Sequence, residues 1–439
     1  MSRLLVLLFA SLHTLSACGG GGEAETAASP PVGAPAPGPV PSPPPAPAPS
    51  CTTPGTLCVG NGQSYTTIQA AVNAAHAGDT VLVYDGNYAG FSVSVSGTAA
   101  RHLVIRAVGN GAVINLANGS GEGITLSNVS HVTVEGFTVN GMSGYGLATH
   151  NGSPTNPMRG LIIRNNTVRD SGSSNIYLSQ VADSLVEGNV ASGSKASHGI
   201  YLANGGSDNT TLRGNRCYEN FKNGIHLNGD QSVGGDGLHS GINLDGNTLY
   251  ANTDNGMDID GLQDSTIQNN LIYGNGRNAV RVFRIDAAAG PKNLRIVNNT
   301  LAVPSGGGWA VKLTEDTGGH VIFNNILWAE SGASGSLAVA STSFTSDRNI
   351  LVNRLSIDGD VSVIGLIAWQ AHGKDATSLL GSSEALFVNP AAANYQLKPS
   401  ASARNTGLMS LAGVAVPSID ILGVARPQGG VTDLGAYEE

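Results

Sequence analysis

The sequence predicts an all-β fold, a solenoid of short stacked coils, and three observations support this prediction. The 439 residues include 60 Gly and 20 Pro, with only 12% charged and 5% aromatic residues, a composition typical of a repetitive, turn-rich chain. Two landmarks, an Asn turn and a Gly-Ile strand, recur in step along the chain. No segment long enough for a helix separates the short apolar strands between them.

The same composition excludes several classes of protein. A hydrophobic fraction of 41% is too apolar for a disordered chain, and 12% charged residues are too few for long helical bundles. The net charge is −9, from 22 Lys and Arg against 31 Asp and Glu. The chain therefore lacks the basic surface that neutralises phosphates, and we expect no DNA or RNA partner.

Residues 1–18 have the pattern of an export signal. Arg3 precedes an apolar run from Leu4 to Leu12, and Leu15-Ser16-Ala17-Cys18 follows. These four residues resemble the lipobox of bacterial lipoproteins, in which the cysteine is acylated and becomes the mature N-terminus. The resemblance implies that Cys18 carries lipid and that the protein is anchored to the outer membrane, facing either the periplasm or the surface.

The next segment and the remaining cysteines support an exported protein. Residues 19–50 are rich in Gly, Ala and Pro and are expected to form an extended tether of polyproline II type. No later run reaches the roughly 18 apolar residues of a membrane span, so lipid is the expected membrane attachment. Cys51 and Cys58 lie close enough to form a disulfide in an oxidising compartment. Cys217 then remains unpaired and is expected to be a small buried hydrophobe.

Asparagine carries the repeat. Landmark residues recur at spacings of 23 to 32, at Asn166, Asn189, Asn215, Asn247, Asn270, Asn299 and Asn325. Stacked coils place equivalent residues about 4.8 Å apart, so we expect these side chains to form a ladder of bonded amides at a turn. An amphipathic segment, residues 66–75, is expected to form a helix that caps the first coil.

From about Tyr65 to Asn353 the chain resembles the superfamily of pectate lyases, alginate lyases, mannuronan C-5 epimerases and polygalacturonases. The segment from Gly141 to His150 is similar to the strand on which the epimerases carry a tyrosine, an aspartate and a histidine, but Ala148 replaces the aspartate. The resemblance implies a right-handed parallel β-helix over residues 51–353 and a substrate groove along the Gly-Ile strand. Residues 354–439, similar to the end of many exported β-helix proteins, are expected to form an irregular extension packed on the last coils.

The alternation of side chains along a strand identifies the outward-facing residues. If Ile225 and Leu227 point inward, then His226 and Asn228 point outward. The same register exposes a group of titratable and aromatic side chains: His150, Tyr177, Tyr201, His226, Asp258, Asp260, Arg281, Phe283 and Lys312. The extra residues of the three longest coils, 151–159, 230–240 and 286–292, are expected to follow this strand and to form one wall of a cleft.

These residue types suit β-elimination on an acidic, uronate-containing polysaccharide, which is the expected partner of a monomeric chain. The reaction needs a base for the C5 proton, an acid for the departing O4 and cations to neutralise the carboxylate. His226 is expected to be the base and Tyr201 the proton donor. The other residues expected to be catalytic are Arg281, Lys312, Asp258 and Asp260. Those expected to bind substrate are His150, Tyr177, Asn228, Phe283 and His239.

Calcium is the one cofactor that the sequence suggests. Asp230 and Asp236, with Asp258 and Asp260, supply the hard oxygen ligands that Ca²⁺ prefers. Two alternatives to a lyase stay open. Asp258 and Asp260 are two strand residues apart, about 6.7 Å, which fits the acid and base of an inverting hydrolase of the polygalacturonase type. A non-catalytic glycan-binding or structural β-helix protein is the other alternative.

Overall fold

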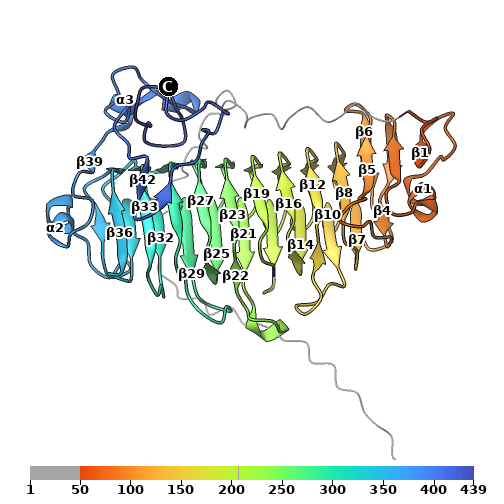
Figure 1. The fold of residues 1–439 in the computed structure, drawn as a ribbon, viewed down its shortest axis with the longest axis horizontal. Helices are drawn as coiled ribbons and strands as arrows, with labels where there is room; N and C mark the ends of the chain where they lie inside the picture. The colour runs from red at the N-terminus through yellow and green to blue at the C-terminus, as the bar shows by residue number, and fades with distance from the viewer. Residues whose placement is uncertain (1–49, 206) are drawn as a thin grey trace, which may run out of the picture.

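The computed structural model describes residues 50–205 and 207–439. Cys18, the predicted signal peptide and most of the predicted tether lie outside these residues. The described chain winds into an elongated solenoid of stacked coils, and its strands form three long parallel sheets that run side by side along the molecule (Figure 1). The predicted all-β, right-handed parallel β-helix is confirmed.

The first and second sheets each contain twelve of the described strands. The first sheet consists of β1 (Thr56–Val59), β2 (Thr80–Val83), β5 (Leu103–Ala107), β8 (Val132–Glu135), β12 (Ile162–Arg164), β16 (Leu185–Glu187), β19 (Thr211–Arg213), β23 (Asn243–Asp245), β27 (Thr266–Gln268), β30 (Arg295–Val297), β33 (His320–Phe323) and β36 (Phe344–Asp347). The second consists of β3 (Gly86–Ala89), β6 (Ala112–Leu116), β9 (Thr138–Asn140), β13 (Thr167–Arg169), β17 (Val190–Ser192), β20 (Arg216–Tyr218), β24 (Thr248–Tyr250), β28 (Leu271–Tyr273), β31 (Thr300–Val303), β34 (Ile326–Ala329), β37 (Ile350–Leu351) and β39 (Leu379–Leu380).

The third sheet holds the Gly-Ile strands and has eleven strands within the described residues. They are β4 (Phe91–Val93), β7 (Ile124–Ser127), β10 (Leu147–His150), β14 (Ile176–Ser179), β18 (Ile200–Ala203), β21 (Ile225–Asn228), β25 (Met257–Asp260), β29 (Val280–Phe283), β32 (Trp309–Leu313), β35 (Gly335–Val339) and β38 (Leu355–Ser356). The inward side chains of the three sheets form one continuous apolar core, which includes the unpaired Cys217.

The remaining elements are short and lie in loops, at the ends or in the C-terminal extension. Two small parallel pairs join neighbouring coils, β11 (Met158–Arg159) with β15 (Val181–Ala182) and β22 (His239–Ser240) with β26 (Leu262–Gln263). The others are α1 (Ile68–Ala74), η1 (Gln231–Val233), α2 (Leu366–Ala371), α3 (Ser383–Leu386), η2 (Pro390–Ala392), β40 (Phe387–Asn389), β41 (Asn394–Leu397), β42 (Ser410–Leu411) and β43 (Val414–Ala415).

The predicted cap covers the first coil. Helix α1 begins after Thr67, whose side chain accepts a hydrogen bond from the Ala70 amide at 3.3 Å, and it buries Ile68, Ala71 and Val72. A disulfide joins Cys51 to Cys58 at the same end. Helix α2 covers the last coil and buries Trp369 in the solenoid core. Both open ends of the apolar core are thereby closed.

The predicted asparagine ladder is present at the turn between the first and second sheets. The amide nitrogen and Nδ2 of Asn215 donate to Oδ1 of Asn247 at 3.0 and 3.1 Å, and Nδ2 of Asn215 also donates to the Val186 carbonyl at 2.8 Å. The same pattern continues from Asn166 to Asn349. Each buried turn amide of this asparagine ladder therefore has a hydrogen-bond partner on the neighbouring coil.

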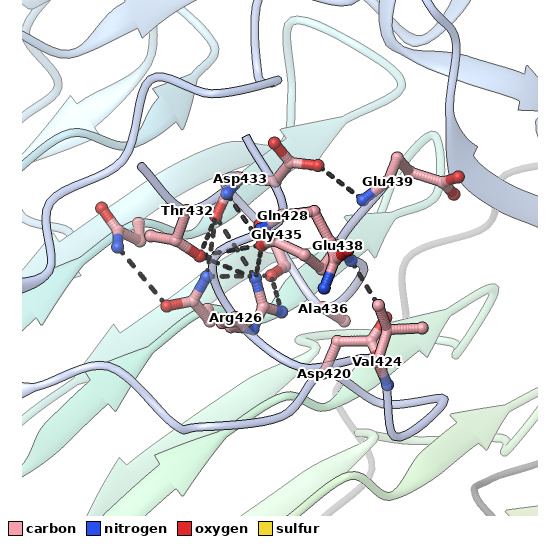
Figure 2. A network of polar contacts seen from close by, with 12 residues as sticks. Asp420, Val424, Arg426, Gln428, Thr432, Asp433, Gly435, Ala436, Glu438 and Glu439 are labelled. Carbon is pink, nitrogen blue, oxygen red and sulfur yellow. Dashed lines mark hydrogen bonds and ion pairs between the residues drawn. The ribbon is translucent and has the colours of Figure 1, made fainter. Parts of the chain in front are cut away.

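The C-terminal extension folds back over the outer face of the second sheet. Its Phe387, Tyr395 and Leu434 bury apolar residues of β28 to β37, such as Leu271 and Ile326. Figure 2 shows the polar network that closes the extension around Arg426. Coils also continue beyond the predicted border at Asn353, because β38 and β39 still pair with the preceding strands. No helix within the described residues is both long enough and apolar enough to cross a membrane.

Candidate functional site

The outward face of the third sheet carries a straight column of functional side chains. Strand pairing places six residues of consecutive coils directly beside one another, in the order Tyr177, Tyr201, His226, Asp258, Arg281 and Lys312. We call this set the site column. Ile225 and Leu227, on either side of His226, are fully buried in the core. The register predicted from side-chain alternation is therefore confirmed for these six residues.

His226 lies at the centre of the site column. Its Nδ1 atom is 2.7 Å from the main-chain oxygen of Asp258, and its ring stacks on His198 with 4.3 Å between centroids. Burial lowers the pKa of His226 to about 4, so the ring is neutral at pH 7. In that state the Nδ1 hydrogen is donated to the carbonyl, which leaves Nε2 as a proton acceptor.

Asp258 lies one coil further along and is held by two donors. Its Oδ1 accepts from Nδ2 of Asn255 at 3.0 Å and from Nη1 of Arg281 at 3.3 Å. Burial raises the pKa of Asp258 to about 6, and the nearby Arg281 charge opposes this shift. Asn255 belongs to a second amide ladder, with Asn223 and Asn278, that runs beside the site column. This ladder fixes the position of the carboxylate.

Tyrosine rings continue the site column toward the N-terminus. Tyr201 is 4.9 Å from the His226 ring and 5.4 Å from Tyr177, centroid to centroid. Tyr145, just before β10, stacks on Tyr177 at 4.4 Å. Burial raises the pKa of Tyr201 above its ordinary value, so this phenol keeps its proton at neutral pH. The structure therefore places a protonated phenol beside a neutral imidazole.

His150 does not lie in the column where the sequence suggested it. Ala148, and not His150, pairs with Tyr177, so His150 faces outward two residues further along its strand. Its Nε2 atom is 2.7 Å from Oε1 of Glu122, a residue that the sequence analysis did not identify. Glu122 also accepts from the Thr125 hydroxyl at 2.6 Å. His150 is thus paired with a carboxylate at the N-terminal end of the face.

Both predicted cations have partners. Arg281 contacts Asp258, and its Cζ atom lies 3.9 Å from the Phe283 ring centroid. Nζ of Lys312 is 2.8 Å from Oδ2 of Asp360, in the loop that follows β38. The Lys312 pair is shorter than the Arg281–Asp258 pair at 3.3 Å, and the Lys312 side chain is 23% exposed against 32% for Arg281, so Arg281 is the better placed cation.

Four predicted site residues are buried, namely Asp258, Asp260, Phe283 and His239, and two of them, Asp260 and His239, are fully enclosed where the sequence analysis expected exposed side chains. Asp260 is 0% exposed and accepts backbone hydrogen bonds from Ile285 at 3.0 Å and Asp286 at 2.6 Å. His239 is also 0% exposed, with Nδ1 at 3.5 Å from the Ser207 carbonyl. Asp260 holds the loop after β29, and His239 lies within β22, which pairs with β26, so neither side chain is exposed to a substrate. Phe283 is almost as deeply buried, whereas Asn228 is half-buried.

The loops after β10, β21 and β29 project from one edge of the solenoid, as the coil lengths predicted (Figure 1). The Gln231 amide donates to the Asp286 carbonyl at 3.1 Å, and the Ala288 amide donates to the Gly237 carbonyl at 3.2 Å. A polar pocket of about 460 Å³ lies between these two loops, lined by Asp230, Gln231, Ser232, Ile285 and Asp286.

The proposed calcium ligands serve local roles in their loop. Oδ1 of Asp230 accepts from the Ser232 amide at 2.8 Å, and Oδ1 of Asp236 accepts from the Leu238 amide at 3.0 Å. In the part of the chain that the structure describes, no group of three or more His, Cys, Asp or Glu side chains is arranged to hold a metal ion. The Ca²⁺ assignment stays a prediction of the sequence.

Comparison with solved structures agrees with this architecture. Pectate lyase Pel9A superposes with a TM-score of 0.50 at 13% identity, over 88% of this chain and 96% of that chain. This chain has the parallel β-helix fold of that lyase. The β-helix is also similar to the A-module of the Azotobacter vinelandii mannuronan C-5 epimerase AlgE4, with 19% identity, 72% of this chain, 95% of that chain and a TM-score of 0.45. A rhamnogalacturonan lyase is 15% identical, and the match covers 70% of this chain and 89% of that chain with a TM-score of 0.46.

One family model matches part of the β-helix. Residues 68–234 match the family described as periplasmic copper-binding protein (NosD), and none of the curated proteins matches. Copper sites use clustered His, Cys or Met ligands. Within this segment His102 lies beside His131 and His198 beside His226, and no group of three or more His, Cys, Asp or Glu side chains in the described chain could hold a metal ion.

Proposed function

We propose that the protein is a polysaccharide lyase that cleaves an acidic, uronate-containing polysaccharide by β-elimination along the outer face of the third sheet. One observation carries this proposal. The neutral His226, whose Nε2 has no hydrogen-bond partner among the described residues, lies beside a protonated Tyr201, with 4.9 Å between the ring centroids. At the level of fold, the pectate lyase Pel9A offers a precedent for this chemistry.

Each chemical requirement of the elimination has a group on the face. Nε2 of His226 takes the proton from C5, and the Tyr201 hydroxyl gives its proton to the departing O4. Arg281, between Asp258 and the Phe283 ring, neutralises the uronate carboxylate and the charge that develops when C5 loses its proton. The two protons balance, and the product carries a C4–C5 double bond.

The acidic residues of the two loops determine how a bound substrate is oriented on the face. Asp230 and Asp286 line the pocket beside the site column, and both raise the pKa of Tyr201 through their charge. A uronate carboxylate is repelled by these groups and is attracted to Arg281. We therefore propose that the polymer lies along the face with its reacting carboxylate turned away from the pocket.

The two alternatives receive less support. An inverting hydrolase needs a second accessible carboxylate, and Asp260 is buried and bound to the backbone. A glycan-binding protein without activity needs only the aromatic and cationic groups, and does not require the free Nε2 of a neutral histidine.

The test is incubation of the protein with a panel of acidic and neutral polysaccharides while ultraviolet absorbance of unsaturated uronate and reducing ends are recorded together. A lyase raises both signals on an acidic polymer. Reducing ends without absorbance would indicate a hydrolase, and neither signal, with retained binding, would indicate a glycan-binding protein. Addition of Ca²⁺ or of a chelator in parallel tests the predicted metal requirement.

We also propose that the chain is exported and anchored through lipid on Cys18, because residues 1–18 have the lipoprotein pattern and the disulfide Cys51–Cys58 suits an oxidising compartment. Labelling with a palmitate analogue should mark the native chain and be lost in Cys18→Ser. Cys217→Ser, which removes the buried free thiol, is the matched control and should keep the label. Equal labelling of Cys18→Ser would contradict the anchor.

A further inference from the structure

His198 lies beside the site column and has no part in the reaction as proposed above. It occupies the position just before the Gly-Ile pair of its coil, and the following coils carry Asn223, Asn255 and Asn278 at the equivalent position. In that ladder the amide nitrogen and Nδ2 of Asn255 both donate to Oδ1 of Asn223, at 2.9 and 3.2 Å. Asn278 donates in the same way to Oδ1 of Asn255, at 3.0 and 2.9 Å. Each of these asparagines therefore needs one acceptor from the coil before it.

His198 supplies the acceptor for Asn223 with a ring nitrogen. The amide nitrogen of Asn223 lies 3.4 Å from Nδ1 of His198, and Nδ2 of Asn223 lies 3.2 Å from the same atom. Both groups of Asn223 are donors, so Nδ1 of His198 accepts and the hydrogen of the neutral imidazole is on Nε2. Burial lowers the pKa of His198 to about 2, so this ring stays neutral. An asparagine at position 198 would offer Oδ1 in place of Nδ1, and the ladder itself does not require an imidazole.

The imidazole makes contacts that an asparagine could not make. Its ring stacks on His226, with 4.3 Å between centroids and 22° between planes, and it meets the Tyr201 ring edge-on at 5.1 Å. Since Tyr201 and His226 are 4.9 Å apart, the three rings contact one another pairwise. His198 is only 6% exposed, so a polymer on the face cannot reach it directly. The ring can influence the reaction only through the base and the proton donor that it touches.

We propose that His198 is a positioning residue for this face, which holds the His226 and Tyr201 rings in place and excludes water from one side of His226. The inference rests on the function proposed above, in which these two residues are the base and the proton donor. The ladder explains why position 198 carries a hydrogen-bond acceptor. The catalytic pair explains why that acceptor belongs to an aromatic ring.

Exclusion of water should be visible in the protonation of His226. Burial is the largest influence on the pKa of His226, which it lowers to about 4. Besides His198 and Tyr201, the titratable or charged groups near the ring are Lys222, His239, Arg281 and Asp258, whose Oδ2 is 3.6 Å from Nδ1. Removal of the covering ring lets water reach His226, so its pKa should rise toward the ordinary value.

Two substitutions at position 198 separate the role of the ring from that of the ladder. His198→Asn keeps an acceptor for Asn223 and removes the ring. The urea midpoint should stay native, while kcat falls at least about tenfold with KM unchanged. Nuclear magnetic resonance titration of the His226 ring should show its pKa rising from about 4 to above about 5.

His198→Phe makes the opposite change, because it keeps a ring and removes the acceptor for both donors of Asn223. The urea midpoint should fall, while kcat and the pKa of His226 stay close to native. His102→Asn, which replaces a half-buried histidine beside the first sheet, is the matched control. It should leave kcat and the pKa of His226 unchanged.

A native pKa of His226 in folded His198→Asn would overturn the proposal, and so would a native kcat in that variant. If His198→Asn unfolds, His198→Phe carries the test, and a pKa of His226 above about 5 in His198→Phe would then overturn the proposal. The titration of His226 needs no substrate. Absence of turnover on every polymer would therefore contradict the lyase proposal, while the titration still decides whether His198 shields His226.

Discussion

Nδ1 of His226 lies 2.7 Å from the main-chain oxygen of Asp258 on the next coil. A carbonyl oxygen can only accept, so the contact selects the tautomer of His226 that has its hydrogen on Nδ1. His198 covers one face of the ring, and Nδ1 of His198 is itself 3.2 Å from Nδ2 of Asn223. The position of the proposed base is therefore fixed by its neighbours.

His226→Ala should lower turnover at least about 100-fold, the scale expected for loss of a general base. The side chain is on the outer face of the sheet and not in the core, so we expect the coil to remain folded. Steady-state rates on the polymer found by the panel measure the effect, and circular dichroism checks the fold. His372→Gln, at an exposed position, is the control. Full activity in a folded His226→Ala variant would contradict the role of His226 as the general base.

The pH dependence of the rate should reflect both central groups of the site column. The pKa of His226 is about 4 and that of Asp258 is about 6. As the pH falls through 6, Asp258 gains a proton and releases Arg281 to the substrate, so the rate rises. As the pH falls further toward 4, His226 is protonated and the base is lost.

We therefore expect a bell-shaped profile of kcat/KM with its maximum between these two values. Asp258→Asn should lose the alkaline side of the bell and keep the acid side. An acid side that moves in Asp258→Asn, or a profile centred well above the pKa of Asp258, would contradict the assigned roles.

Stability should fall in mild acid because three buried histidines are neutral in the folded state. Burial lowers the pKa of His198 to about 2 and those of His226 and His239 to about 4, against about 6.5 when unfolded. Below pH 6.5 the unfolded chain therefore binds more protons than the folded chain, and the free energy of unfolding decreases.

Asp258 acts in the opposite direction, because its raised pKa lets the folded state bind a proton first as the pH falls. Burial also raises the pKa values of Asp208, Asp245, Asp260, Asp433 and Glu439, so these carboxyls act in the same direction as Asp258. We expect the three histidines to outweigh them, with a net loss on the order of 1–3 kcal/mol between pH 7 and pH 5. Denaturant unfolding at both pH values measures it. His372→Gln, which removes an exposed histidine, should leave the difference unchanged. Equal stability at pH 7 and pH 5 would contradict this prediction.

Much of this architecture could be predicted because a solenoid repeats its own pattern. Asn215 and Asn247 occupy the same position of adjacent coils, so sequence spacing alone aligned them, and side-chain alternation then placed His226 outward. Alternation cannot show what covers an outward residue. Asp260 points outward, but the loop after β29 folds over it and supplies three backbone donors.

Residues outside the strand were the ones that the sequence analysis missed. His198, Glu122 and Asp360 touch the site from turns and loops, where no period fixes the direction of a side chain. His198 did leave a signal. It precedes the Gly-Ile pair at the position where the next coils carry Asn223 and Asn255, and this ladder is what holds it beside His226.

The asparagine ladder should be essential for stability. Asn247→Ala leaves the buried Asn215 amide and the Leu212 carbonyl without their partners, which should cost about 3–5 kcal/mol. Urea unfolding measures the loss. Asn115→Ala removes an amide that bonds only to Asn87 on the exposed surface, and should change stability by less than about 0.5 kcal/mol. Similar losses of unfolding free energy in the two variants would show that the buried ladder stabilises the fold no more than an exposed amide pair does.

The C-terminal extension should depend on one buried ion pair. Nη1 of Arg426 lies 2.9 Å from Oε2 of Glu438, and both side chains are 0% exposed. The same carboxylate accepts from the Asp433 amide at 2.9 Å and the Gln428 amide at 2.8 Å, as Figure 2 shows around Arg426. Glu438→Gln removes the charge and keeps the size, so it leaves a buried guanidinium without its partner.

This loss should destabilise the extension by about 3–5 kcal/mol, because an unpaired buried charge is far more costly than a broken surface pair. Local unfolding should follow, with the coils still intact because their own core does not include Arg426. Hydrogen exchange should then speed up over residues 381–439 and stay slow in the coils. Asp170→Asn, which breaks the exposed pair with Lys195, is the matched control and should leave exchange unchanged. Unchanged exchange of the extension in Glu438→Gln would show that apolar packing alone holds it on the solenoid.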